Sequence, residues 1–228
     1  MNIDNLIWGL IDAVSAAICF VLVWFMTKPY RFIGERKYIG LPVGFSFLGA
    51  SYVIGVIGFL EPAGFVDVLR WVQLFTQSYA FAFLAVTYYF SKREKETVLS
   101  FVIAFVAILT AVAVSLAVIL VAPMYDLPHF RTVDDYMRIF NMVCISYIAI
   151  HTLKSHASNP DAKTIWIPLS YLLFDFGQYS LLIWSLDASF SAFIGAHFLR
   201  VAALVVFLFV AYQTFYSSDE EYPRKGLE

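Results

Sequence analysis

Seven polar side chains interrupt otherwise apolar stretches of the sequence, and their types suit the binding of a small molecule. They are Asp12, Gln73, Gln77, Asp175, Gln178, His197 and Arg200. An ionisable group within a membrane helix costs at least ~2.5–3.5 kcal/mol on insertion scales, so it faces the bundle interior and needs a partner. These residues therefore predict a polar binding site, for a small solute or a lipid, inside a helical membrane bundle.

Asp175 and Arg200 are predicted to form a direct or water-bridged pair. Asp175 lies 12 residues before Asp187, at the centre of a predicted turn, and Arg200 lies 13 residues after it. Antiparallel neighbours that rise 1.5 Å per residue bring the two charges to a similar depth. His197 and Gln178 are each three residues from one of these charges, and therefore share its helix face.

Asp12 is at the depth of His197 by the same count, and these two residues can pair if the first and last helices are neighbours. An alternative is that these charges have a purely structural role and only hold the helices together. However, most of the polar groups fall in the predicted outer half of the membrane, which favours a binding site over scattered structural contacts.

No complete catalytic or metal-binding motif is present. Only His151 and His197 lie in apolar stretches, near opposite ends of their helices, whereas a zinc hydrolase needs about three converging ligands. The absence of lysine within any predicted helix excludes the retinal Schiff base of microbial rhodopsins. Cys19 and Cys144 fit buried apolar positions. We expect no cofactor, and we do not expect an enzyme.

The elements that carry these side chains are long apolar blocks. Of the 228 residues, 61% are hydrophobic and 14% are charged, which departs from the composition of soluble proteins in the direction of membrane proteins. Since about 20 apolar residues cross a bilayer, we predict an all-α protein with seven transmembrane helices. The predicted helices span residues 6–26, 39–60, 68–90, 97–121, 136–153, 164–186 and 190–216.

Residues 1–216 form one predicted transmembrane domain, and residues 217–228 form a short polar cytoplasmic tail. Basic residues in short loops mark the cytoplasmic side. With the N-terminus outside, three basic loop residues are external: Arg70, Arg131 and Arg138. Eleven are cytoplasmic: Lys28, Arg31, Arg36, Lys37, Lys92, Arg93, Lys95, Lys154, Lys163, Arg224 and Lys225. We therefore predict a multi-pass protein of the cell membrane, with a cytoplasmic C-terminus.

The segment 122–135 is the longest predicted external loop, and it holds several charged residues. Loops of this length are often functional. We predict that it caps the outer mouth of the bundle, with a short surface helix from Val133. Residues 27–37 form a basic loop on the opposite side.

A shift of 126 residues reveals a weak internal repeat. It places Lys28 on Lys154, Lys37 on Lys163, Ile39 on Ile165 and Pro42 on Pro168. Helices one to three would then repeat as helices five to seven, with the fourth as a connector. This arrangement resembles the parallel repeats of SWEET-type sugar transporters. The Pro-Gln pair of those transporters is absent, because Val43 and Leu169 follow the two prolines.

Two functions fit these features. The first is a receptor-like sensor or interaction module, whose polar pocket in the outer half binds a small molecule or lipid and whose cytoplasmic loops contact a protein partner. The second is a small-solute transporter or channel, in which Asp12 or Asp175 couples to protons. Glycines crowd the second predicted helix and not the sixth, which favours close packing over matched hinges. The lipid bilayer is the expected surrounding, and a net charge of −2 gives no footprint for nucleic acid.

Overall fold

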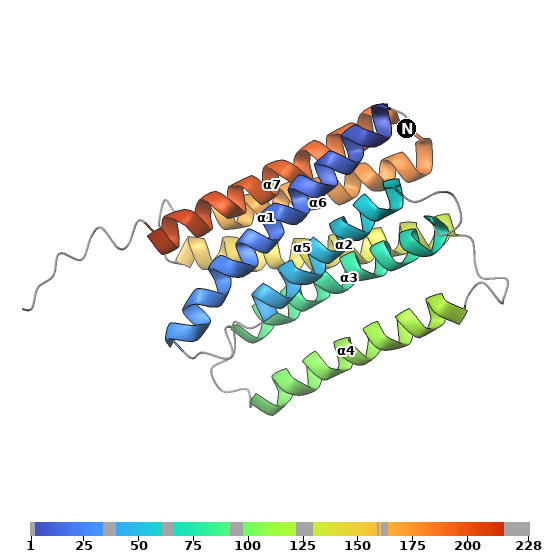
Figure 1. The fold of residues 1–228 in the computed structure, drawn as a ribbon. Coiled ribbons are helices and arrows are strands. Elements are labelled where there is room, and N and C mark those ends of the chain that lie inside the picture. The colour runs from blue at the N-terminus through green and yellow to red at the C-terminus, as the bar shows by residue number, and fades with distance from the viewer. Residues whose placement is uncertain are drawn as a thin grey trace, which may run out of the picture.

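The chain folds into seven α-helices joined in sequence order (Figure 1). They are α1 (Ile3–Ile33), α2 (Gly40–Leu60), α3 (Val66–Ser91), α4 (Val98–Val121), α5 (Phe130–Ser158), α6 (Trp166–Asp187) and α7 (Phe190–Tyr216). The computed structural model describes residues 3–33, 40–60, 66–91, 98–121, 130–158, 160 and 164–216, with side chains over somewhat shorter stretches. The predicted all-helical class is confirmed.

Two helices extend well beyond their apolar blocks. α5 begins at Phe130, six residues before the predicted start, and ends at Ser158 rather than at residue 153. α1 continues to Ile33, through part of the predicted basic loop. The expected surface helix from Val133 is therefore the first part of α5 itself. Hydrophobicity marks the stretch of a helix that suits lipid, whereas the hydrogen-bonded backbone continues into polar sequence.

Six of the helices close into a ring. The neighbours in order are α1, α2, α3, α5, α6 and α7, and α7 returns to α1. α4 packs against α3 on the outside of this ring (Figure 1). α1, α3, α5 and α7 all run from the end of the bundle that holds the N-terminus, here called the N end, to the opposite C end.

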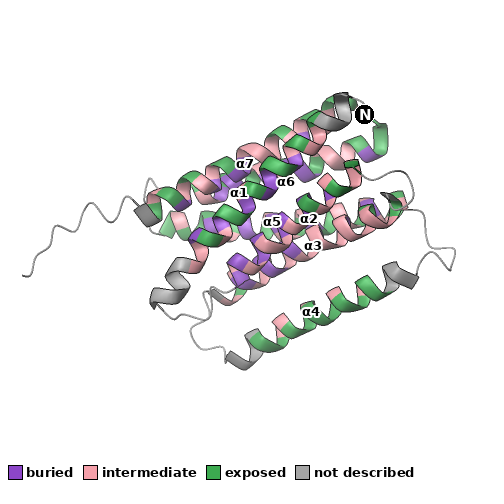
Figure 2. Ribbon diagram, viewed as in Figure 1, coloured by how far each residue is buried: buried purple, intermediate pink, exposed green. Residues whose placement is uncertain are grey.

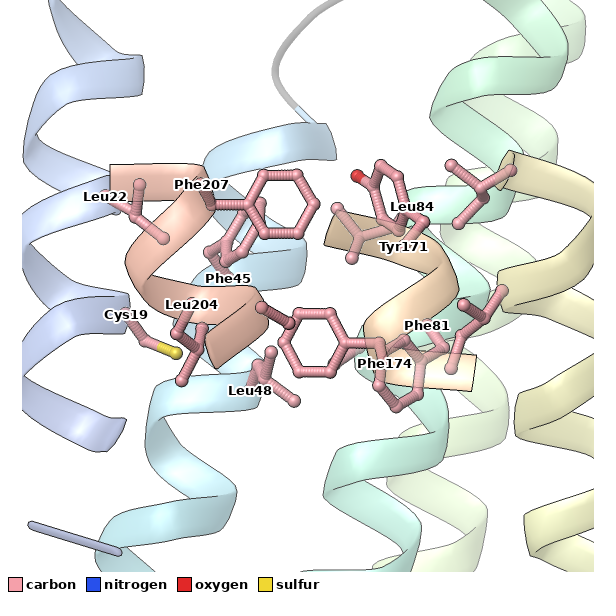
Figure 3. Packing of buried hydrophobic residues seen from close by; sticks show 14 of the residues in the cluster. Cys19, Leu22, Phe45, Leu48, Phe81, Leu84, Tyr171, Phe174, Leu204 and Phe207 are labelled. Atoms are coloured by element: carbon pink, nitrogen blue, oxygen red, sulfur yellow. The ribbon is translucent and has the colours of Figure 1, made fainter. Parts of the chain in front are cut away.

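Aromatic side chains fill the centre of the ring. Phe207 of α7 packs against Phe45 of α2 and Tyr171 of α6, with ring centroids 5.5 and 4.8 Å apart. Phe174 of α6 meets Phe81 of α3 at 5.9 Å (Figure 3). Rings from four helices therefore interlock in one layer, which fixes the helices on both sides of the ring relative to one another.

The outward faces of the helices are apolar. Phe198, Ile150, Leu10 and Val143 are 73, 67, 64 and 64% exposed, and most of the described part of α4 is exposed as well (Figure 2). Soluble monomers rarely present extensive apolar surface. Four described segments are long and apolar enough to cross a membrane: Ile7–Thr27, Gly40–Leu60, Phe130–Ser158 and Phe190–Thr214. Both observations support an integral membrane protein.

Candidate binding sites inside the bundle

A buried ion pair joins α1 to α7. Nη2 of Arg200 donates a hydrogen bond to Oδ1 of Asp12 across 2.5 Å, and the two side chains are 13 and 5% exposed. A guanidinium needs a carboxylate in such surroundings because it does not deprotonate in proteins. The pair therefore neutralises two charges at the contact that closes the ring.

α2 and α3 complete the surroundings of this pair. The guanidinium carbon of Arg200 lies 4.5 Å from the ring centroid of Tyr52, within the range of a cation–π contact. Gly55, one turn further along α2, leaves room for polar side chains. A β-carbon at Gly55 would collide with the Asp12 carboxylate and would lie 2.7 Å from Nε2 of Gln73. We call Asp12, Tyr52, Gly55, Gln73 and Arg200 the Asp12–Arg200 cluster.

Two polar atoms of this cluster are buried and have no hydrogen-bond partner among the described residues. They are the hydroxyl oxygen of Tyr52 and Nε of Arg200. Most buried polar atoms in proteins are hydrogen-bonded, and each exception needs an explanation. Together they offer one N–H donor and one hydroxyl, which can donate or accept, beside a charge pair that is neutral overall.

His197 lies one turn from Arg200 but belongs to a different environment. Its ring packs against Phe193 and Trp8, with centroids 4.3 and 5.1 Å apart. Its Nδ1 is 2.8 Å from the carbonyl oxygen of Phe193, to which it donates a hydrogen bond. Trp184 of α6 also contacts Phe193. His197 therefore joins an aromatic group near the N end. The predicted Asp12–His197 pair is wrong among the described residues, because Asp12 binds Arg200 instead.

The predicted Asp175–Arg200 pair is wrong as a direct contact. Arg200 binds Asp12, and Asp175 instead accepts a hydrogen bond of 2.6 Å from the Ser146 hydroxyl of α5. Gly177 marks the side of α6 that faces α7, because a β-carbon there would lie 3.5 Å from the Ala196 carbonyl oxygen of α7. Two residues turn a helix by about 200°. Asp175 therefore points away from the side of α6 that faces α7.

Gln178 also faces α5. Oε1 of Gln178 accepts a hydrogen bond from Nδ2 of Asn141 at 3.4 Å, and both side chains are buried. Asn141, Ser146, Asp175 and Gln178 form what we call the α5–α6 polar interface. Oδ1 of Asn141 and Oδ1 of Asp175 are buried there, and neither has a hydrogen-bond partner in the part of the chain that the structure describes. The single site predicted from sequence is therefore divided into two clusters.

The two remaining glutamines belong to α3. Gln73 reaches the Asp12–Arg200 cluster at Gly55. Gln77 is half-buried one helical turn further along and is not part of either cluster as defined. The structure therefore brings Gln73, but not Gln77, to the Asp12–Arg200 cluster.

A third polar group at the N end was missed by sequence reasoning. Asp134 and Arg138 form a buried i,i+4 ion pair at 2.8 Å. The Ser185 hydroxyl donates a hydrogen bond of 2.5 Å to Asp135, and Arg131 donates to the backbone carbonyl of Ser185. These contacts tie the start of α5 to the end of α6.

Sequence reasoning overlooked these contacts because it assigned residues 122–135 to one loop outside the bundle. Asp134, Arg138 and Asn141 are spaced four and three residues apart, which is the spacing that would have indicated one face of a helix. The predicted capping role of the loop falls on residues 122–129, which lie outside the described residues.

The side chains of the Asp12–Arg200 cluster and the α5–α6 polar interface offer charged groups and hydrogen-bond donors and acceptors inside the bundle. Among the described residues, no three His, Cys, Asp or Glu side chains are placed to hold a metal ion. Comparisons with protein family models, with curated proteins and with solved structures find no match for this chain.

Proposed function

We propose that this chain is a seven-span, receptor-like sensor of the cell membrane that binds a small polar molecule or a lipid headgroup at the Asp12–Arg200 cluster. The observation that carries the proposal is a buried ion pair with two unpartnered polar atoms beside it, held by four helices. A purely structural ion pair needs no such unsatisfied groups, whose burial costs about 1–3 kcal/mol each.

The cluster lies in the N-end half of the bundle. Counted at 1.5 Å per residue from the helix ends, Asp12, Tyr52, Gln73 and Arg200 are all about 11–15 Å from the N end. In the proposed topology, with seven spans and the N-terminus outside, this layer is in the outer half of the membrane. A ligand from outside would therefore reach it before the aromatic core.

The cluster is also placed to transmit binding. The α1–α7 contact closes the ring, and the Asp12–Arg200 ion pair is part of that contact. A ligand with a carboxylate, phosphate or zwitterionic group would compete with Asp12 for Arg200 and weaken this ion pair. The resulting shift in helix packing would extend to the C end, where we propose that the cytoplasmic loops contact a protein partner.

Ligand-dependent thermal unfolding of the full chain in lipid nanodiscs tests this proposal. The probes are a defined panel of amino acids, short carboxylic acids and glycerophosphate esters. A true ligand at 100 times its Kd should stabilise the protein by about 2.7 kcal/mol. We expect at least one probe to raise the Tm of the wild type, with the shift reduced in Tyr52→Phe and lost in Arg200→Gln.

Arg70→Gln is the matched control, because Arg70 forms an exposed pair with Asp67 at 3.7 Å. It should respond to the probes as the wild type does. A panel that shifts no Tm, or that shifts Arg200→Gln as much as the wild type, would refute binding at the cluster.

Transport is the second candidate, and the burial pattern favours it. The ring has the same order of neighbours when α1, α2 and α3 are exchanged with α5, α6 and α7. The 126-residue shift also superimposes buried positions of α2 on buried positions of α6. The coincident pairs are Pro42 and Pro168, Gly44 and Ser170, Phe45 and Tyr171, Leu48 and Phe174, Ser51 and Gly177, and Tyr52 and Gln178.

The same shift relates buried positions of α1 and α5, namely Ser15 and Asn141, Cys19 and Ile145, and Leu22 and Ile148. α4, outside the ring, would be the connector of a 3+1+3 repeat. Transporters built from two such repeats move one half against the other around a central site. This candidate keeps the proposed topology and adds proton-coupled movement of a small solute.

A further inference from the structure

Asp175 is a carboxyl group near the middle of α6 with only one of its oxygens engaged. It lies 12 residues before the end of the helix at Asp187, or about 18 Å from the N end. Its Oδ2 accepts the 2.6 Å hydrogen bond from Ser146. Its Oδ1 is buried without a partner. A carboxylate is an acceptor at both oxygens, so an ionised Asp175 would leave one oxygen unsatisfied.

Asn141, in the same interface, also has an acceptor oxygen that lacks a hydrogen-bond donor among the described residues. Its side chain is fully buried, its Nδ2 is engaged by Gln178, and its Oδ1 has no partner. Gln178 follows Asp175 by three residues, so the two hydrogen-bonded contacts across the interface are about 4.5 Å apart along α6. Two buried acceptor oxygens therefore belong to adjacent contacts of the same interface, about one helical turn apart along α6. A hydrogen on one of them, donated to the other directly or through one water, would satisfy both.

No ion pair compensates a charge on Asp175 among the described residues. α6 packs against α5 and α7, and its aromatic residues also contact α3. Arg138 pairs with Asp134, Arg200 pairs with Asp12, and His197 donates to the Phe193 carbonyl. His151 of α5 packs against the rings of Tyr88 and Tyr147, and the Tyr171 hydroxyl donates to that of Tyr88 of α3. An isolated carboxylate in a low-dielectric interior is strongly disfavoured and takes up a proton instead.

We propose that Asp175 and Asn141 form a proton-binding site. The proton forms an O–H bond to Oδ1 of Asp175, and this hydroxyl donates to Oδ1 of Asn141 directly or through one water. Release breaks that O–H bond, passes the proton to water and leaves a carboxylate held by Ser146. A sodium ion fits less well, because hard cations take about six oxygen ligands and the interface offers two unpartnered oxygens.

Polar side chains continue from this site toward both ends of the bundle. Toward the N end are the Asp134–Arg138 pair and the Asp135–Ser185 hydrogen bond. Toward the C end, the hydroxyls of Tyr171 and Tyr88 are 3.4 Å apart, and Nδ1 of His156 is 2.7 Å from the Thr164 hydroxyl. The inference is independent of ligand binding at the Asp12–Arg200 cluster, and it would supply the coupling ion of the transport candidate.

Infrared difference spectroscopy of the full chain in lipid, recorded in H₂O and in D₂O, tests the site. We expect the wild type to show the C=O stretch of a protonated carboxyl group, shifted in D₂O, and to lose it as the pH is raised. The band should be absent in Asp175→Asn. It should persist in Asp187→Asn, the matched control at the exposed end of the same helix. A wild type without the band, or a band unchanged in Asp175→Asn, would overturn the site.

Thermal unfolding gives a second readout. Asp175→Asn supplies an N–H donor where the protonated acid has O–H, so its Tm should equal that of the wild type, whereas Asp175→Leu should lower it. An equal loss in both variants would indicate an ionised Asp175, with the Asn141 amide turned to donate to it, and would refute the proposal.

Proton uptake by liposomes that enclose a pH-sensitive dye separates the site from the transport candidate. A protein with the band but without flux keeps the proton site and loses proton-coupled transport. Flux that is equal in the wild type and in Asp175→Asn would refute Asp175 as the carrier of that proton.

Discussion

Arg200 and Asp12 neutralise each other inside the bundle, so the stability of each depends on the presence of the other. Removing one member of a buried pair leaves an uncompensated charge, which typically costs 3–5 kcal/mol, whereas removing both avoids that cost. Arg200 also lies over the Tyr52 ring, a contact that does not involve Asp12. The energetic role of the pair can therefore be separated from that of its surroundings.

We predict that Asp12→Asn and Arg200→Gln each lower the free energy of unfolding by about 3–5 kcal/mol, and that the double variant loses clearly less than their sum. Denaturant unfolding in detergent micelles measures all three variants. Two further combinations serve as controls. Asp67→Asn with Arg70→Gln, in an exposed pair, should change stability by less than about 1 kcal/mol. Asp175→Asn with Arg200→Gln should be additive. Additivity of the Asp12 and Arg200 losses would contradict the pair.

Sequence reasoning placed Asp12, Asp175 and Arg200 inside the bundle but did not find their partners. Depth can be counted along a helix, and on that basis Asp175 was matched with Arg200 and Asp12 with His197. Rotation about the helix axis depends on which face packs against which neighbour, and apolar sequence on all sides leaves that face undefined. Tyr52 was missed because aromatic residues are common throughout this sequence, and Gly55 because a missing side chain carries no polar signal.

At the scale of elements, apolar periodicity located all seven helices, and the predicted ends of the seventh coincide with α7. The start of α5 was misplaced because its first turns are polar. Asp134 and Arg138 are nevertheless buried there, where they satisfy each other one turn apart. Where a helix continues beyond its apolar stretch, ion pairs between neighbouring turns satisfy its polar side chains in place of hydrophobic packing. The sequence contains the spacing of those pairs but not the burial that makes them important.

The glycines of α2 test the packing of this element. We predict that Gly55→Ala destabilises the protein by about 1–3 kcal/mol, because its methyl group would collide with Asp12 and Gln73. Gly58, one turn further along, has no heavy atom within 4 Å of the place that a methyl group would occupy. Gly58→Ala should therefore be stabilising by up to about 1 kcal/mol, since alanine favours the helix. Thermal unfolding in the same detergent measures both. Equal effects at the two positions would show that the Asp12 and Gln73 side chains do not pack closely against Gly55.

At the scale of the whole molecule, apolar side chains cover the outside of the bundle as well as filling most of its core. Ion pairs and amides lie inside the ring, and large apolar residues cover its outside. This arrangement supports a membrane environment, but it does not distinguish one direction of insertion from the other. Direction is set by the basic residues of the connecting segments, because positively charged loops are retained in the cytoplasm.

The last prediction concerns that direction. Eleven basic residues fall on the C-end side of the bundle and three on the N-end side, so we predict that the C end faces the cytoplasm and that all seven helices cross the membrane. The probes are single cysteines at Ser217 and Asp126, both outside the described residues, in a chain with Cys19 and Cys144 replaced by alanine. A membrane-impermeant maleimide added to intact cells should label the cysteine at position 126 and should reach position 217 only after the cells are opened.

Labelling of both positions from outside would require an even number of spans between them, and the reverse pattern would require the opposite orientation. Either result would also move the Asp12–Arg200 cluster out of the outer half of the membrane or change the set of helices that enclose it, so the ligand-binding proposal depends on this measurement as well.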